Sequence, residues 1–382
     1  MRIALLVTLV PRAAYVHIPF CAHHCGYCDF AVVAGRDDLM DSYLNALQKE
    51  MGPEQDEVDT IFLGGGTPSH LPLPQLKRLL DILRRRFTLN PDHEYSIEVN
   101  PDSITEEKLQ LLKEYGVNRM SIGAQSFHTR TLAVLERKHI AEEVPRVVEL
   151  ARGYMQSISL DLIFGAPGQT LFQWQMDLER ALALPINHLS TYGLTYEKGT
   201  RLWKSVREGA ILPLTEEDER RMLDLAMDWM YEAGWEHYEI SSFATVGHRC
   251  RHNQAYWINL PFYGFGLGAA RHLNFIREVN TRSMDGYIKK CLAGESPTQQ
   301  RESHTPESYA RETATLNLRR KEGIIRPMFL QQTELSIDEL AGDVIRRFVH
   351  QELLDDDGTA IKLTKEGKFM ADTVCAAFVS AI

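Results

Sequence analysis

From residue 15 to about residue 200, short runs of β-branched and aromatic residues alternate with helical patterns, and this alternation limits the fold more than any other feature. Repeated strand–helix units are typical of a parallel sheet. The expected strands cover residues 15–20, 60–66, 94–100, 119–126, 159–166 and 189–196. The expected helices cover residues 39–50, 75–87, 106–115, 142–152 and 172–183. Six such units predict an α/β fold, an open, partial (β/α)6 barrel whose strands end at a common site.

Two of the expected helices begin with a capping box. In such a box, the side chain before the helix accepts the backbone N–H of the residue three positions later, and the side chain of that residue accepts the backbone N–H of the first. The boxes are Ser103-x-x-Glu106 and Thr170-x-x-Gln173. At the start of the chain, residues 1–10 form an apolar run that is too short to cross a bilayer. We interpret this run as a first strand or an irregular start rather than as a signal peptide.

The last third of the chain follows a different pattern. After an expected helix at 216–233 and a strand at 237–243, a glycine- and aromatic-rich loop leads into helices, and Asp355-Asp-Asp-Gly358 predicts a hairpin turn. The tail resembles a winged-helix unit, an α+β domain. Residues 336–382 contain five Lys/Arg and nine Asp/Glu, so we expect a lid or interaction domain rather than a DNA-binding one. The predicted division is a barrel over residues 1–245 and a C-terminal domain over 246–382.

Charge and cysteine content narrow the classes of partner. The net charge of −10 argues against nucleic acid, because phosphate binding needs clustered Lys and Arg. The six cysteines, three of them within eight residues, do not form the framework of a secreted disulfide protein. A reducing cytoplasm is the expected compartment.

Three of these cysteines, Cys21, Cys25 and Cys28, directly follow the first expected strand, and the next cysteine is Cys250. Three thiolates can hold a [4Fe–4S] cluster and leave one iron open, which is of no use to a plain electron carrier but can accept S-adenosylmethionine (SAM). A zinc site is the alternative, and its fourth ligand is then one of four neighbours: His17, His23, His24 or Asp29. Three structural cysteines are the remaining interpretation.

Polar residues recur where the later strands end. Strand two ends in Leu63-Gly-Gly-Gly-Thr-Pro68, whose backbone N–H groups suit a carboxylate. Strand three ends in Ser96-Ile-Glu98-Val-Asn-Pro101, whose carboxylate suits an ammonium or a ribose. Ser121-Ile-Gly-Ala-Gln125-Ser-Phe127 and Asp161-Leu-Ile-Phe-Gly-Ala-Pro-Gly168 repeat the design on strands four and five.

With Tyr15-Val-His-Ile-Pro-Phe-Cys21, these motifs resemble the radical SAM superfamily, and within it the oxygen-independent coproporphyrinogen III oxidase-like group. The resemblance covers nearly the whole chain and implies two cofactors, a [4Fe–4S] cluster and SAM. The positions that match the family's SAM contacts are Tyr15, Tyr27, Gly65, Gly66, Thr67, Glu98, Gln125, Arg137, Asp161 and Gly193. One departure is Glu136, which stands where the family usually has Gly, and it puts the role of Arg137 in question.

Two marks of the true oxidases are missing. The resemblance implies that those enzymes carry a fourth cysteine two residues after the third, where this chain has Phe30, and a longer segment before the cluster. Instead, His252-Asn253-Gln-Ala-Tyr256-Trp257 is similar to the His-Asn-x-x-Tyr-Trp motif of the HemW branch, described as haem chaperones. An imidazole is a common haem ligand, and aromatic rings pack on a flat macrocycle. Arg249 and Arg251 are then expected to pair with the haem propionates.

The same segment has other interpretations. It can be a structural loop that closes the barrel, with His252 hydrogen-bonded and the aromatic side chains in the core. Cys250 is a competing ligand, and His272 is a reserve ligand on a flexible loop with Gly264, Gly266 and Gly268. Cys291 and Cys375 lie in helical patterns and are expected in the core.

We therefore expect a cytoplasmic haem chaperone that passes haem to an acceptor such as a respiratory haem protein, without coproporphyrinogen dehydrogenase activity and with no catalytic residue. The alternative is an oxygen-independent coproporphyrinogen III dehydrogenase, which decarboxylates its substrate oxidatively by radical SAM chemistry. The sequence allows transient docking on a membrane and a homodimer. It leaves open whether SAM is cleaved and whether haem is bound covalently.

Overall fold

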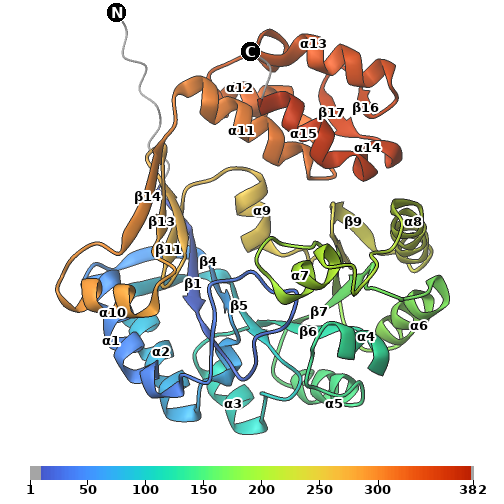
Figure 1. Cartoon of the computed structure of the whole chain (residues 1–382). Helices are drawn as coiled ribbons and strands as arrows, with labels where there is room; N and C mark the ends of the chain where they lie inside the picture. Colours follow the sequence, from blue (N-terminus) through green and yellow to red (C-terminus); the bar gives the residue numbers. More distant parts are fainter. Residues whose placement is uncertain (1–9, 380–382) are drawn as a thin grey trace, which may run out of the picture.

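The computed structural model describes residues 10–379 and is built around one large, curved sheet with helices outside it (Figure 1). The expected first strand within residues 1–10 lies almost wholly outside the described residues. Six parallel strands form the centre of the sheet: β1 (Ala13–Ile18), β4 (Asp56–Gly65), β5 (Phe87–Val99), β6 (Arg119–Gln125), β7 (Ser157–Phe164) and β8 (His188–Gly193). Each pairs in parallel with the next, so the predicted partial (β/α)6 barrel is confirmed.

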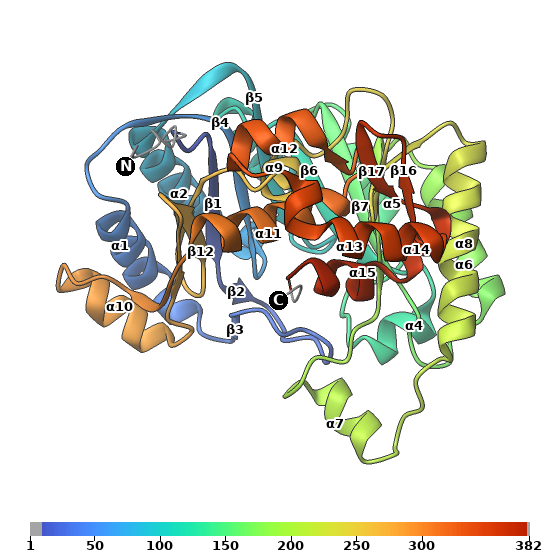
Figure 2. The ribbon, with the colours of Figure 1, turned by 90° about the horizontal axis from the view of Figure 1, so that it is seen from above.

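The connections between these strands carry the helices. They are α1 (Met40–Met51), α2 (Leu73–Arg86), α3 (Glu106–Glu114), α4 (Thr129–Val134), α5 (Glu143–Ala151), α6 (Leu171–Leu182), α7 (Arg201–Arg207) and α8 (Glu216–Glu232), with the 3-10 turns η1 (Asp37–Leu39) and η2 (Pro68–His70). The expected helices are all present, with ends that differ by no more than two residues. The short α4 and α7 were not expected, because six or seven residues hold too little of a helical period. Viewed from above, α7 projects away from the other helices (Figure 2).

One of the two expected capping boxes is present. At the start of α6, the Thr170 hydroxyl accepts from the Gln173 N–H at 3.2 Å and the box is complete. The box at Ser103 is wrong, because Thr105 caps α3 and accepts from the Lys108 N–H at 3.4 Å. The Ser103 hydroxyl donates instead to the Asn100 carbonyl at 2.8 Å, which holds the turn that follows β5.

Side chains alternate between the two faces of the central strands, and the two faces differ in polarity. On β5, Tyr95, Ile97 and Val99 enter the main hydrophobic core under the helices, whereas the residues between them are polar. On β6, Met120 and Ile122 do the same. The apolar outer face therefore supplies the packing energy, and the inner face is free to carry polar groups.

Further strands extend the sheet at both edges: β11 (Phe262–Phe265), β12 (Ala270–Leu273), β13 (Ile276–Asn280) and β14 (Thr298–Ser303) beside β1, and β10 (Ser242–Ala244) and β9 (Glu236–Glu239) beside β8. Between these groups lie α9 (Arg251–Trp257) and, before β14, α10 (Met284–Leu292). The single strand expected at 237–243 is wrong, because the chain reverses there into the antiparallel pair β9–β10.

The C-terminal residues form a smaller α+β unit above the barrel in Figure 1, as expected. Its elements are α11 (Pro306–Leu318), β15 (Ile324–Ile325), α12 (Arg326–Thr333), α13 (Ile337–His350), β16 (Leu354–Asp356), β17 (Ala360–Leu363), α14 (Lys365–Phe369) and α15 (Ala371–Val379). The predicted hairpin at Asp355–Gly358 joins β16 to β17. A separate hydrophobic cluster, which includes Ala310, Ile345 and Phe378, holds the unit together.

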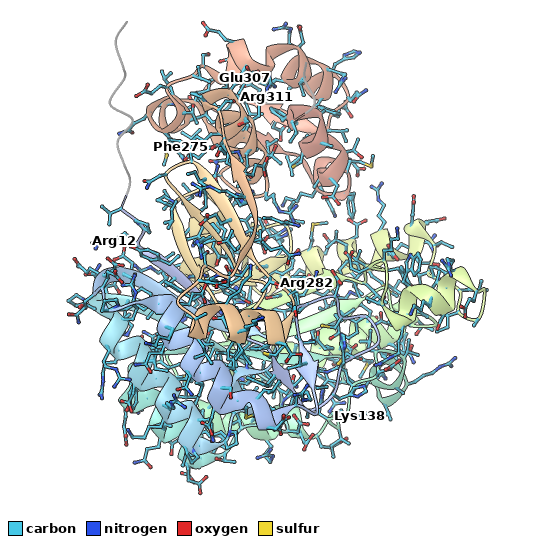
Figure 3. The ribbon with its side chains drawn as sticks, turned by 60° about the vertical axis from the view of Figure 1, so that its left-hand side comes forward. Arg12, Lys138, Phe275, Arg282, Glu307 and Arg311 are labelled. Carbon is cyan, nitrogen blue, oxygen red and sulfur yellow. The ribbon has the colours of Figure 1, made fainter. Side chains whose placement is uncertain are left out.

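Contacts at two places join this unit to the barrel. Phe275, at the tip of the β12–β13 hairpin, packs against Tyr309 with ring centroids 4.8 Å apart (Figure 3). On the opposite side, Lys365 pairs with Asp224 of α8 at 3.0 Å. The predicted domain boundary at 245/246 stays a prediction, and β11–β14 continue the main sheet. None of the helices within residues 10–379 is long and apolar enough to cross a membrane.

Candidate functional site

The three neighbouring cysteines lie on a loop at the C-terminal end of the barrel. Cys21 ends the short β2 (Phe20–Cys21), and the loop returns through β3 (Val33–Ala34), which pairs with β2. All three thiols line one cavity of about 470 Å³. Burial raises the pKa of Cys21 to about 11 and also raises that of Cys28. Since metals bind thiolates, ionising these thiols requires a strong positive charge at the loop, which an iron–sulfur cluster supplies.

The strand ends that were predicted to bind SAM open into the same cavity. Nine of the ten expected contacts line it: Tyr27, Gly65, Gly66, Thr67, Glu98, Gln125, Arg137, Asp161 and Gly193. The tenth, Tyr15, lines a neighbouring cavity that also touches Glu98. The structure thus brings together residues from all six parallel strands and the cysteine loop, although each residue's role toward a ligand stays a prediction.

The glycine turn after β4 has a role that differs from the expected one. Its N–H groups were expected to suit a carboxylate, and Gly65 donates to that of Glu98 at 3.0 Å rather than to a ligand. Gly66 and Thr67 donate to the main-chain carbonyls of Ile18 and Phe20, each at 2.9 Å. A Cβ at Gly66 would lie 2.8 Å from the Phe20 carbonyl oxygen. Glycine is therefore needed so that this turn can pack against the strand that carries Cys21.

Two buried carboxyl groups, Glu98 and Asp161, face the cavity. Burial, together with the nearby Asp161, raises the pKa of Glu98 to about 8. Burial also raises the pKa of Asp161, which accepts from the Ser121 hydroxyl at 3.0 Å. Neighbouring carboxyls in a poorly solvated site favour a ligand that brings an ammonium, a sulfonium or hydroxyl donors.

Arg137 crosses from the strand ends to the cysteine loop. Its guanidinium donates to Asn100 Oδ1 at 2.6 Å, to the Gly123 carbonyl at 2.8 Å and to Cys25 Sγ at 3.7 Å. The preceding Glu136 has φ of 55°, in the left-handed region that favours glycine. The departure from the family's Gly therefore keeps the backbone conformation and leaves Arg137 in the site. The Glu136 side chain forms an ion pair with Arg201.

The expected haem motif lies on α9, at the opposite end of the barrel interior. Glu94 of β5 accepts the backbone N–H groups of Arg251 at 2.8 Å and His252 at 3.0 Å, and so fixes the start of the helix. The His252 ring stacks on Phe62 with centroids 5.3 Å apart. Burial lowers the pKa of His252 to about 3, so the imidazole is neutral near pH 7, which is the form that binds a metal.

Both ring nitrogens of His252 already have protein partners. Nδ1 lies 2.8 Å from the Thr60 hydroxyl, and Nε2 lies 2.8 Å from the Tyr256 hydroxyl, one helical turn later. The side chain is 1% exposed. A metal that binds Nε2 has to replace the Tyr256 contact.

A second cavity of about 210 Å³ lies between α9 and the inner face of the strands, and three of the expected SAM contacts, Tyr15, Glu98 and Asp161, line it. His252, Asn253 and Tyr256 line its α9 side, and Trp257 does not reach it. The Trp257 ring instead lies under the Arg319 guanidinium at 4.9 Å. The walls shared with the larger cavity are Glu98, Ser121, Asp161 and Tyr192. Arg119, Ser190 and Tyr192 were not predicted, although the period-two alternation of β6 and β8 places them on the inner face, and Ser121 was named only as part of a strand-end motif.

The two arginines expected to pair with propionates are engaged elsewhere. Arg249 pairs with Glu236, and with Glu322 at 2.7 Å. Arg251 donates to the Asp92 carbonyl at 2.5 Å. Neither lines the cavity that His252 faces, so this expectation is wrong.

Two further expectations about this region are also wrong. Gly264 and Gly266 are not in a flexible loop: a Cβ at Gly264 would lie 1.7 Å from the Ala270 carbonyl oxygen, because β11 and the following turn are tightly packed. His272 lies in β12 away from the His252 cavity, beside His304 with ring centroids 5.5 Å apart. Cys250 is buried, with its thiol 3.5 Å from Glu94 Oε1. Cys291 and Cys375 are buried in helices, as expected.

Comparisons with known families agree with these motifs. Residues 15–181, which include the three clustered cysteines, match the model of the radical SAM superfamily. Residues 304–370 match the HemN C-terminal domain.

Individual proteins extend the match to nearly the whole chain. "Heme chaperone HemW" of Bacillus subtilis is 37% identical over 97% of this chain and 100% of its own length. "Heme chaperone HemW" of Escherichia coli is 36% identical over 74% of this chain and 77% of its own. Among solved structures, the coproporphyrinogen III oxidase HemN of Escherichia coli superposes with a TM-score of 0.85 over 97% of this chain and 91% of its own. Its sequence identity is 22%, so that likeness describes the fold alone.

Proposed function

The chain belongs to the HemW family of the radical SAM superfamily, and we propose that it is a haem chaperone that binds haem and passes it to an acceptor haem protein. The observation that carries the proposal is the near full-length likeness to relatives named heme chaperones. Membership of the superfamily implies a [4Fe–4S] cluster and SAM as cofactors.

The cysteine loop fits a cluster better than the alternative zinc site, because the superfamily match covers all three cysteines. Cys21, Cys25 and Cys28 would hold the cluster through three of its irons and leave the fourth open to SAM. SAM would bind in the cavity that the strand ends line, where the carboxyls of Glu98 and Asp161 would attract its positive groups. When bound, the cluster and SAM supply one-electron chemistry at the sulfonium. Phe30, 68% exposed, occupies the position of the oxidases' fourth cysteine.

The haem site is the inner end of the barrel, where His252 presents a neutral imidazole to a cavity. Ligand pockets usually measure roughly 300–1,000 Å³. The cavity of about 210 Å³ therefore has to widen before a macrocycle enters. Coordination through Nε2 also replaces the hydrogen bond to Tyr256, so the Tyr256 hydroxyl has to move away when haem binds. Asn253 and Tyr256 then line the haem pocket, and Trp257 supports α9 from behind.

The test is anaerobic reconstitution with iron and sulfide, followed by haem titration and transfer to an apo-acceptor. We expect saturable binding of about one haem per chain and transfer without loss of haem to solvent. The variant His252→Ala should lose most of this binding. The matched control is His272→Ala, which removes a buried histidine outside the cavity. Consumption of coproporphyrinogen III with SAM and reductant, without stable haem binding, would establish the dehydrogenase instead.

We further propose that the protein works in the cytoplasm, where its six free thiols stay reduced. The proposed acceptor is a haem protein such as a respiratory enzyme. Transient docking on a membrane would bring the chaperone to such an acceptor. A homodimer stays a prediction, and sedimentation of the reconstituted protein with and without haem tests it.

A further inference from the structure

Arg119 of β6 is a buried cation without a hydrogen-bonded partner, although the carboxyls of Glu94 and Asp161 lie near enough to raise its pKa. It is 3% exposed and lines the cavity of about 210 Å³ that His252 faces. Among the described residues, its guanidinium forms no side-chain hydrogen bond and no ion pair within 4.0 Å, and its Nε is buried and unpaired. Burying a charge without a partner is costly, so such a group is expected to face a ligand or ordered water.

The nearby acceptors are already engaged. Glu94 accepts the two N–H groups that start α9, and Asp161 accepts from Ser121. By contrast, Arg86, an equally buried arginine at the base of the sheet, pairs with Asp56 at 2.6 Å. Arg119 therefore lines the cavity without a hydrogen bond, beside the hydroxyls of Ser121 and Ser190 and the carboxyls of Glu98 and Asp161. Burial raises the pKa of both carboxyls, that of Glu98 to about 8, so Glu98 is mostly protonated near pH 7 and does not repel an anionic ligand.

A guanidinium fork matches the two oxygens of a carboxylate, and the pairing strengthens when both groups leave water. Haem carries two carboxylate arms, and the cavity, although too small for the macrocycle, has room for one of them. His252 lines the same cavity. Arg249 and Arg251 are occupied by Glu236, Glu322 and Asp92.

We propose that Arg119 binds a propionate of the haem that His252 coordinates. This inference rests on the proposed function and deepens it: Arg119 is the protein group that would distinguish haem, which carries propionates, from an uncharged porphyrin. A propionate would give the buried Arg119 guanidinium a partner, which it lacks because Glu94 accepts from the start of α9 and Asp161 accepts from Ser121. The propionate would enter between β6 and α9, so haem would be oriented with this arm toward the barrel wall.

The experiment compares haem with its dimethyl ester, which keeps the iron and the macrocycle but lacks both charges. The reconstituted full-length protein should bind haem about tenfold more tightly than the ester, the size of one charge-assisted interaction. In Arg119→Gln, the affinity for haem should fall to that for the ester, while the affinity for the ester stays the same. The control Arg86→Gln removes an equally buried arginine outside the cavity and should keep the tenfold preference.

A protein that binds both ligands equally, or an Arg119→Gln variant that keeps the preference, overturns the inference. Arg119→Lys keeps the charge without the fork, and an intermediate preference is expected. If Arg119→Gln does not fold, Arg119→Lys tests the inference instead. A preference for haem over the ester as large as that of the native protein would then contradict a role for the guanidinium fork. Failure to bind either ligand would reject the proposed function itself, which keeps the two outcomes distinct.

Discussion

The two ends of the barrel interior are built in different ways. At the C-terminal end, the cysteine loop and the strand ends open into a cavity of about 470 Å³, where burial raises the pKa values of Cys21, Cys28 and Glu98. At the other end, α9 closes the barrel, and both nitrogens of His252 are hydrogen-bonded around a cavity of about 210 Å³. The proposed cluster and SAM site is preformed, whereas the proposed haem site has to exchange internal hydrogen bonds for its ligand. We therefore expect mutations at the two ends to have different effects on cluster content, haem affinity and stability.

The largest expected effect is loss of the cluster in Cys25→Ser. A hydroxyl is a poor iron ligand, so iron and sulfide bound after reconstitution should fall by about tenfold or more. Haem binding should persist, because the His252 cavity lies at the other end of the barrel. Cys291→Ser is the matched control, since Cys291 is buried in α10 outside both cavities. If Cys25→Ser also abolished haem binding, the two ends would not be independent.

The second effect concerns the internal bonds of His252. In Tyr256→Phe, His252 Nε2 has no hydrogen bond that must break before it binds iron, so haem should bind about three- to tenfold more tightly. In Thr60→Val, Nδ1 loses the partner that orients the ring, and haem should bind more weakly. Spectroscopic haem titrations of the two variants measure both changes. Equal affinities in the two variants would contradict coordination by this imidazole.

The third effect is the pH dependence of the preformed end. The folded-state pKa of Glu98 is about 8, above its ordinary 4.5, so the native state holds this proton longer than the unfolded state does. In the cluster-free protein, Glu98 therefore lowers the free energy of unfolding as the pH rises from about 4.5 to about 8, by at most about 1.4 kcal/mol per pH unit.

Glu98→Gln lacks this contribution, so its free energy of unfolding relative to the native protein should increase with pH across that window and level off above it. Denaturant titrations at several pH values measure the difference. The exposed Glu179→Gln is the matched control. A pH-independent difference for Glu98→Gln would mean that the carboxyl is ionised throughout.

The smallest effect concerns the positive φ of Glu136 at the rim of the cysteine cavity. Glu136→Gly relieves the left-handed strain but loses the ion pair with Arg201, so the free energy of unfolding should change by less than about 1 kcal/mol. Glu136→Ala loses the ion pair and keeps the strain, and should be about 1 kcal/mol less stable than the Gly variant. Equal stability of the two variants, measured by urea titration, would show that the backbone here is not strained.

Much of the preformed end was predictable from sequence, because its signals are local. Three cysteines within eight residues have to share one loop, and the polar ends of parallel strands have to meet at one edge. The glycine turn shows the limit of this reasoning: its composition suggested free N–H groups, but Ile18 and Phe20, from a distant segment, accept two of them.

The α9 end was predictable in its residues but not in its contacts. The motif named His252 and Tyr256, and the structure adds that they lie one turn apart on α9 and bond to each other. The expected propionate partners Arg249 and Arg251 were wrong, because other elements of the fold supply their acceptors: Glu236 and Glu322 for Arg249, and Asp92 for Arg251. Arg119 was missed because a cation on a strand shows its importance only when its surroundings leave it unpaired.

The sequence by itself determined the six strand–helix units, the cysteine loop and the polar strand ends, since each depends on residues that are close together in the chain. Only the tertiary structure decided which polar groups are satisfied and which are free. Hydrogen bonding is a matter of neighbours in space: Glu94 holds α9 across more than 150 residues, Thr60 holds His252 across 192, and Arg119 is left facing a cavity. Packing around a buried donor, which no local pattern encodes, determines whether that donor supports the fold or is available to a ligand.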